Sequence, residues 1–306
     1  MPRSELPPEL GPQFGVGQAR RAGVSKRRLT SPDLTSEFRG SRTRRGGEAP
    51  EADAFAARFQ ALLLRCRAFL PVAPADFQFS HVTAARLHRI PIPEALETRA
   101  TIDVTVAGST VPRRAGVIGH RAVRLPRTVL VEGLPVVSVE RAWIQLAAVL
   151  ALDDLVIAGD FLVRRKSPAS TIANLTAAAR ASAGMPGAAR ARAALGEIRS
   201  GTDSPRESRL RLVIVRAGLP EPVIGHTVTF QNYFVGTPDL AYVRERIALD
   251  YDGSVHRDDE RVYIDDVERR QLFADADWRY ITITRQNLRV PHSFLVRLDR
   301  LLRERG

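Results

Sequence analysis

Three aspartates near the C-terminus are the residues whose type and spacing best suit chemistry. Asp250 and Asp252 belong to the run 247–252, in which side-chain types alternate as they do in a β-strand. Because successive side chains of a strand point to opposite faces, these two carboxylates share one face with Ala248. Asp239 lies in the preceding segment. A hairpin between the two segments would bring it beside Asp250.

Carboxylates gathered at one place repel one another and need shared protons, an arginine partner or a hard divalent cation. Mg²⁺ (or Mn²⁺) binds carboxylates together with substrate phosphate oxygens, an arrangement used in phosphodiester hydrolysis. Turn formation is the competing explanation, because Asp239 follows a proline and Asp252 precedes a glycine. Asp250 is harder to explain in this way, since aspartate is unfavourable inside a strand. We therefore expect Asp239 and Asp250 to bind the metal, with Asp252 in support.

His256 and Glu207 are two further candidates for catalysis. His256 could orient water, act as a general base or protonate the leaving group, because its pKa lies near neutrality. An ordinary surface histidine is the alternative. Glu207 follows Ser204-Pro205 in the pattern of a helix capping box, which explains it structurally. It also shares a helix face with Leu210 and Ile214, so a role in the site stays open.

The elements that must position these residues form a helix, a hairpin, a crossover helix, a strand and a last helix. This order predicts a compact α/β domain. Arg269 and Arg270 lie on the crossover helix. The expected ranges are a helix from Pro205 to Ala217, strands His226–Tyr233 and Ile247–Asp252, a helix Asp258–Ala274, a strand Tyr280–Thr284 and a helix Phe294–Arg303.

The N-terminal segment has the pattern of a helix, a tight turn and a second helix. The first helix is expected over Val16–Ala22 and the second over Ser25–Leu29. The first turn of the second helix would present Lys26, Arg27 and Arg28, where a recognition helix meets DNA. Phe38–Arg42 would form a short wing that adds Arg42. A helical hairpin on any basic surface gives the same pattern, which is the alternative.

The middle segment alternates helical and strand patterns. Its histidines, His81, His88 and His120, match no metal-ligand spacing and are expected to cap or pack. The whole chain is thus expected to be a multidomain α/β protein with segments 1–50, 51–200 and 203–306. Helices are expected over Ala54–Leu70, His81–Leu87, Ser138–Leu150, Leu152–Arg164 and Ala173–Arg199 (broken near Gly184–Gly187), and strands over Ile102–Val106, Gly116–His120 and Leu134–Val137.

The amino-acid composition favours a soluble protein that binds polyanions. The net charge is +12 and the pI about 11.0, which favours DNA as a partner. An arginine-rich codon usage is the alternative explanation, because Lys26 and Lys166 are the only lysines. Cys66 is the only cysteine, so an intramolecular disulfide is excluded. With no apolar run long enough to span a membrane and no signal-peptide pattern, we expect a cytoplasmic protein without a membrane partner.

The C-terminal segment resembles the restriction-endonuclease-like (PD-(D/E)XK) superfamily, in the branch of the very-short-patch-repair endonuclease. The likeness rests on Glu207, on Pro238-Asp239, on Asp250-Tyr251-Asp252-Gly253 with His256, on Arg269-Arg270 and on Trp278. It implies a Mg²⁺-dependent DNA endonuclease in which Asp239 and Asp250 bind the metal and Glu207 assists. Asp250 stands where this branch usually has glutamate. The superfamily's lysine has no counterpart after Lys166, which makes His256 its natural substitute.

Residues 10–164 resemble AbiEi-type antitoxins, through Phe14–Leu29, the run 80–87 and the run 134–138. This likeness implies an N-terminal winged helix, an α/β domain and repression of a toxin–antitoxin operon, with a homodimer or a toxin/antitoxin partner possible. Two hypotheses follow. The chain is a Mg²⁺-dependent DNA endonuclease with a basic DNA-binding part. Alternatively, it is a non-enzymatic DNA-binding regulator with a degenerate nuclease domain.

Overall fold

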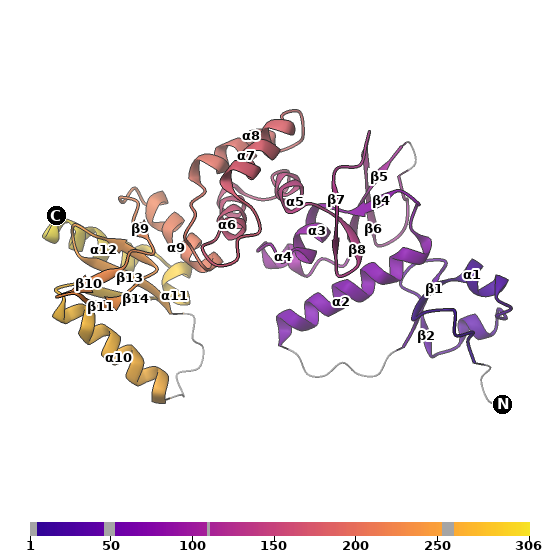
Figure 1. The fold of residues 1–306 in the computed structure, drawn as a ribbon, viewed down its shortest axis with the longest axis horizontal. Helices are drawn as coiled ribbons and strands as arrows, with labels where there is room; N and C mark the ends of the chain where they lie inside the picture. The colour runs from indigo at the N-terminus through magenta and orange to yellow at the C-terminus, as the bar shows by residue number, and fades with distance from the viewer. Residues whose placement is uncertain (1–4, 46–52, 109–110, 253–259) are drawn as a thin grey trace. The chain divides into compact units, whose positions relative to one another are not determined.

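The protein is described by a computed structural model that covers residues 5–45, 53–108, 111–252 and 260–306. In the last of these ranges, side chains are described from residue 267 onward. Its contacts define two compact units, residues 1–150 with 177–191 and residues 151–176 with 192–306 (Figure 1). Both contain helices and mixed sheets, so the expected multidomain α/β class is confirmed. The division places the predicted N-terminal segment and most of the middle segment in one unit.

The N-terminal module is a three-stranded antiparallel sheet with one helix. The strands β1 (Gln13–Gly15), β3 (Ser41–Arg44) and β2 (Leu34–Thr35) lie in that order. The hairpin between β2 and β3 contains the predicted wing. Helix α1 (Val16–Arg21) confirms the first predicted helix. Phe14, Ala19 and Leu29 are buried in the module's core.

The second predicted helix of this module is wrong. In place of a helix over Ser25–Leu29, a single 3₁₀ turn, η1 (Arg28–Thr30), is present. The hydroxyl groups of Thr30 and Ser31 both donate to the carbonyl oxygen of Arg27, at 2.9 and 3.5 Å. Such side-chain bonds to the backbone offer an alternative to continued helix, and they end the turn here.

A five-stranded mixed sheet forms the centre of the first unit. Helix α2 (Ala54–Phe69), capped by Asp53, precedes it and contributes Phe69 to its core, in edge-to-face contact with Phe79. The expected helix His81–Leu87 is present as α3, but the Ser80 side chain does not cap it. The order across the sheet is β6 (Val117–Ala122), β5 (Ile102–Ala107), β4 (Phe77–Phe79), β8 (Leu134–Val137) and β7 (Thr128–Val131).

Of the remaining helices up to residue 197, α4 (Glu94–Glu97) was not predicted. The predicted helices are present as α5 (Val139–Leu146), which ends before the expected Leu150, α6 (Leu152–Leu162), α7 (Ile172–Ala181) and α8 (Ala188–Glu197). The predicted break between the last two is confirmed. Gly187 has φ +83°, and a Cβ there would lie 2.4 Å from the carbonyl carbon of Ala147. Within the described ranges, no helix combines the length and apolarity needed to cross a membrane.

A four-stranded sheet forms the C-terminal part of the second unit. Its order is β14 (Arg279–Thr284), β13 (Ile247–Asp252), β12 (Leu240–Tyr242) and β9 (Val223–Ile224), and only the pair β13–β14 is parallel. Leu249 packs with Leu210 of α9 (Pro205–Arg216) and Phe294 of α12 (His292–Arg305). On the other face, Ala248 packs with Phe273 of α10 (Glu260–Asp275). The predicted alternation along 247–252 is therefore confirmed.

The predicted strand His226–Tyr233 is wrong, because the chain reverses inside it. Two short strands, β10 (Val228–Phe230) and β11 (Tyr233–Gly236), pair as an antiparallel hairpin. The two residues between them, Gln231 and Asn232, have φ of +48° and +67°. Positive φ at both central residues defines the type I′ turn that suits a two-residue hairpin.

Candidate functional site

Asp239 and Asp250 lie side by side, and each carboxylate accepts a hydrogen bond from a backbone N–H of the neighbouring strand. The antiparallel register pairs Leu240 with Leu249, which sets Asp239 opposite Asp250. The backbone N–H of Asp239 donates to Oδ1 of Asp250 at 2.6 Å, and the N–H of Tyr251 donates to Oδ2 of Asp239 at 2.7 Å. We refer to these two residues as the Asp239–Asp250 pair.

Arg269 offsets the charge of Asp250, and Tyr280 adds a further hydrogen bond. Arg269 donates to Oδ2 of Asp250 from Nε at 3.1 Å and from a terminal nitrogen at 2.8 Å. The Tyr280 hydroxyl donates to the same oxygen at 2.6 Å. With the backbone N–H of Asp239, Asp250 accepts four hydrogen bonds, and its side chain is only 15% exposed. Arg269 thus supplies the arginine partner that is one of the three expected ways to offset clustered carboxylates.

The pKa of Asp239 is raised to about 7. Burial is the main cause, because it disfavours the charged carboxylate. The hydrogen bond from Tyr251 opposes this effect, and the negative charges of Glu207 and Asp250 add to it. Asp239 is consequently a group that exchanges its proton near neutral pH.

Glu207 caps α9, and its negative charge also acts on Asp239. The Ser204 hydroxyl oxygen accepts from the Glu207 N–H at 3.2 Å, as predicted. Oε2 of Glu207 accepts from the N–H of Asp203 at 2.8 Å, one residue earlier than a capping box requires. The cap thus differs in detail from the expected one. Glu207 helps to raise the pKa of Asp239, so the two carboxyl groups interact through their charges.

Two cationic residues near Glu207 were not predicted from the sequence. Arg165, which follows α6, donates from Nε to Oδ2 of Asp203 at 3.1 Å, and Nζ of Lys166 lies 3.6 Å from the same oxygen. The hydrogen bond that Arg165 donates to Asp203 is the main cause that raises the pKa of Arg165, and the charges of Glu207 and Asp239 contribute. No local pattern identifies these residues, because they precede the predicted domain altogether.

One oxygen of Asp250 does not fit a divalent cation as the side chains lie. Oδ2 accepts three hydrogen bonds, so a cation there would have to displace Arg269 or Tyr280, whereas Oδ1 accepts the N–H of Asp239. Over the described ranges, no group of three histidine, cysteine or acidic side chains is placed to hold a metal ion. Asp252 ends β13 half-buried, and His256 lies outside the described residues. Arg270 is exposed and donates to the Thr282 hydroxyl at 3.3 Å.

The cations predicted to bind nucleic acid at the N-terminus divide into two kinds. Lys26 and Arg27 are exposed. Arg28 is largely buried and donates to both carboxylate oxygens of Asp33, at 3.0 and 2.8 Å. Arg42 donates from Nε to the Leu29 carbonyl oxygen at 2.7 Å. Arg28 and Arg42 therefore hold the module together, which leaves Lys26 and Arg27 as the better-exposed candidates.

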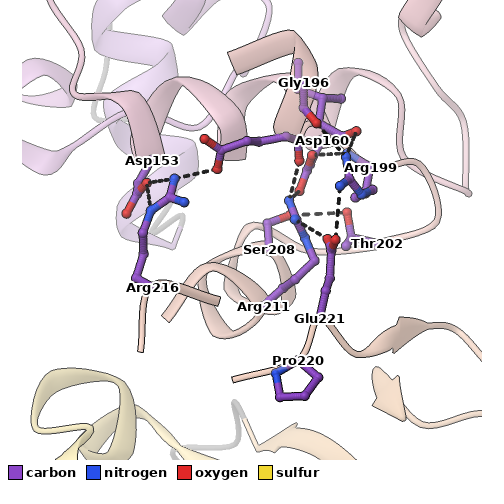
Figure 2. A network of polar contacts seen from close by, with 12 residues as sticks. Asp153, Asp160, Gly196, Arg199, Thr202, Ser208, Arg211, Arg216, Pro220 and Glu221 are labelled. Carbon is purple, nitrogen blue, oxygen red and sulfur yellow. Dashed lines mark hydrogen bonds and ion pairs between the residues drawn. The ribbon is translucent and has the colours of Figure 1, made fainter. Parts of the chain in front are cut away.

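A buried ion pair fixes α9, and with it Glu207, to the rest of the second unit (Figure 2). Arg211 donates to Oδ2 of Asp160 at 2.9 Å, and their side chains are 2% and 0% exposed. Arg211 also donates to Glu221 at 2.8 Å, and the N–H of Arg199 donates to Oδ1 of Asp160 at 2.8 Å. Burial raises the pKa of Asp160. Asp160 was not predicted to have a role, although an aspartate within an apolar helix indicates a buried polar contact.

Comparison of the chain with protein-family models, with curated proteins and with solved structures finds no match in any of the three. A function can therefore be inferred only from the residues described above.

Proposed function

We propose that the protein binds DNA as a non-enzymatic regulator of the antitoxin type, and that its C-terminal domain is a nuclease-like scaffold without metal-dependent activity. The observation that carries this proposal is the fourfold hydrogen bonding of Asp250 by Arg269, Tyr280 and the backbone of Asp239. Oδ2 accepts three of these bonds and is closed to a metal ion while Arg269 and Tyr280 hold it, and the charge of Asp250 is already offset.

Charge and the N-terminal module support the DNA-binding half of the proposal. The net charge of +12 attracts polyanions over a long range. Lys26 and Arg27 are exposed on the module that also carries the β2–β3 wing.

We include in the proposal a cytoplasmic location and a possible homodimer or toxin/antitoxin partner. Cys66, the only cysteine, is a buried thiol whose pKa burial raises to about 12.

A Mg²⁺-dependent endonuclease is the second candidate, and the Asp239–Asp250 pair favours it. Asp239 has a pKa of about 7, mainly through burial, so it could accept a proton from an attacking water at neutral pH. His256 would share this proton transfer, with Asp252 in support. In this function Asp239 and Asp250 would hold the metal ion, and Arg269 would have to leave Asp250 if Oδ2 were the ligand.

One paired assay separates the two functions. The purified full-length protein and an Asp239→Ala variant are incubated with labelled duplex and single-stranded DNA, with Mg²⁺ or Mn²⁺. Binding is read on native gels and cleavage on denaturing gels. We expect both proteins to shift the DNA in a salt-sensitive manner and neither to cut it. Cleavage by the wild type that Asp239→Ala abolishes would establish the endonuclease. Absence of any DNA binding would contradict both functions.

A further inference from the structure

A basic groove lies in the first unit, outside the residues discussed so far. Its volume is about 830 Å³, and it is lined by the N-terminal strands, by α2 and by the residues around α4. Two carboxylates, Glu37 and Glu97, also line it. The cationic side chains along it are Arg44, Arg45, Arg58, Arg65, Arg86 and Arg99, so positive charge is in excess.

Several buried donors of this groove lack a hydrogen-bond partner. Among the described residues, the Nε atoms of Arg65, Arg86 and Arg99 are buried without one, as is Oγ1 of Thr43. All four residues line the groove. A buried polar group without a partner costs about 1–3 kcal/mol, so such groups are normally satisfied. Each of these three guanidinium groups also forms an ion pair, with Glu37, Glu97 and Asp103 respectively, so its hydrogen-bonding capacity is filled only in part.

The carboxylates of the groove satisfy these arginines only in part. Glu37 accepts from Arg65 at 2.7 Å, whereas Glu97 lies 3.7 Å from Nε of Arg86. The Arg86 side chain is 10% exposed, and burial lowers its pKa. An anion nearby offsets the energetic cost of burying a cation. A ligand with several negative charges would therefore be electrostatically complementary to the arginines of the groove.

The floor of the groove is apolar. Ala61, Leu62, Leu64 and Ala68 of α2 line it, and Leu64 is 52% exposed. Small-molecule sites combine apolar walls with a few placed polar groups in about 300–1,000 Å³. A ligand that suits this groove has a flat or apolar part for the helix and a polyanionic part for the arginines.

We propose that this groove binds a polyphosphorylated small molecule of the nucleotide class. Its phosphates are held by Arg65, Arg86 and Arg99, and its base lies on the apolar residues of α2. The partly buried guanidinium groups can donate to the phosphate oxygens of a molecule small enough to enter the groove, whereas the backbone of a duplex contacts only exposed cations. The site is separate from both the Asp239–Asp250 pair and the predicted DNA contacts Lys26 and Arg27.

The test uses the full-length protein and calorimetric titration with ATP, without added metal. Tripolyphosphate tests the contribution of the charges, and adenosine tests that of the base. Arg65→Gln is expected to weaken ATP binding at least tenfold. The matched control is Arg67→Gln on the same helix, because Arg67 does not line the groove and donates to the Glu132 carbonyl oxygen instead. Arg67→Gln should change the affinity less than twofold.

A gain of affinity provides a second readout that a folding defect would not mimic. Glu37→Gln frees Arg65 from its ion pair and should tighten ATP binding about threefold or more. The proposal is overturned if wild-type protein binds neither ATP nor tripolyphosphate, or if Arg67→Gln weakens binding as much as Arg65→Gln does. It is also overturned if Arg65→Gln weakens binding of a DNA duplex while ATP does not bind, because the groove then serves nucleic acid.

Discussion

Arg269 donates two hydrogen bonds to a single carboxylate oxygen of Asp250, at 3.1 and 2.8 Å. A third donor, the Tyr280 hydroxyl, reaches the same oxygen. Arg269 comes from α10 and Tyr280 from the strand parallel to β13, so two separate elements converge on one oxygen. This convergence sets an arginine on a carboxylate that the resemblance to nucleases predicts to be a metal ligand.

The raised pKa of Asp239 predicts a pH-dependent stability. Its pKa in the folded chain is about 7, mainly through burial, against 3.8 as its ordinary value. A raised pKa means that folding favours the protonated form, so this stabilisation is complete below pH 4 and is lost as the pH rises through 7. The loss is on the order of 4 kcal/mol at most.

Urea unfolding of the wild type and of Asp239→Asn, from pH 4 to pH 8, measures this effect. The asparagine keeps an oxygen that can accept from the N–H of Tyr251 and does not titrate. We expect the two proteins to have similar unfolding free energies at pH 4, and the variant to be the more stable one at pH 8. A difference that stays constant over this range would show that Asp239 has an ordinary pKa.

Removal of the charge of Asp160 should destabilise the second unit. Asp160→Asn leaves the guanidinium of Arg211 buried with less compensation, and a broken buried ion pair costs about 3–5 kcal/mol. Because Arg211 keeps its ion pair with Glu221 in this variant, we expect a loss of unfolding free energy near the lower end of that range. Asp153→Asn is the control, because its ion pair with Arg216 is partly exposed and contributes about 1 kcal/mol or less. Equal losses in thermal or urea unfolding would contradict this ranking.

The exposed cations of the N-terminal module should contribute to DNA affinity through phosphate contacts. Lys26→Gln with Arg27→Gln removes two positive charges and should flatten the slope of log K against log salt by about 2. The control is Arg300→Gln with Arg303→Gln, which removes the same charge from exposed positions on α12. Fluorescence anisotropy with a labelled duplex measures both. If the two double variants lose affinity equally, only the overall charge of the chain matters.

The sequence predicted the C-terminal elements well where periodicity is strong. The alternation over Ile247–Asp252 is confirmed, and it sets Asp250 on the face of α10. The Asp239–Asp250 pair follows from the same pattern, because two adjacent strands in a short hairpin have only a few possible registers. Helix ends were also predictable where a capping serine or a glycine marks them, as at Ser204.

Sequence patterns could not predict contacts between residues that are distant in the chain. The bond of Arg269 to Asp250 depends on how α10 packs on the sheet, and periodicity does not fix that packing. The same holds for Arg165, which approaches Asp203 from another part of the chain. The hairpin turn at Gln231-Asn232 was missed for a different reason. Glutamine is an uncommon residue at a positive φ, so the turn signal is weak.

The most direct test of the central claim, that Arg269 and not a divalent cation neutralises Asp250, is Mn²⁺ binding followed by electron paramagnetic resonance. Wild type, Asp239→Asn, Arg269→Gln and the double variant are titrated as full-length proteins. We predict equal Mn²⁺ binding by wild type and Asp239→Asn. Arg269→Gln should gain a site at least tenfold tighter, which the added Asp239→Asn substitution removes. Binding of Mn²⁺ by the wild type that Asp239→Asn abolishes would contradict the account.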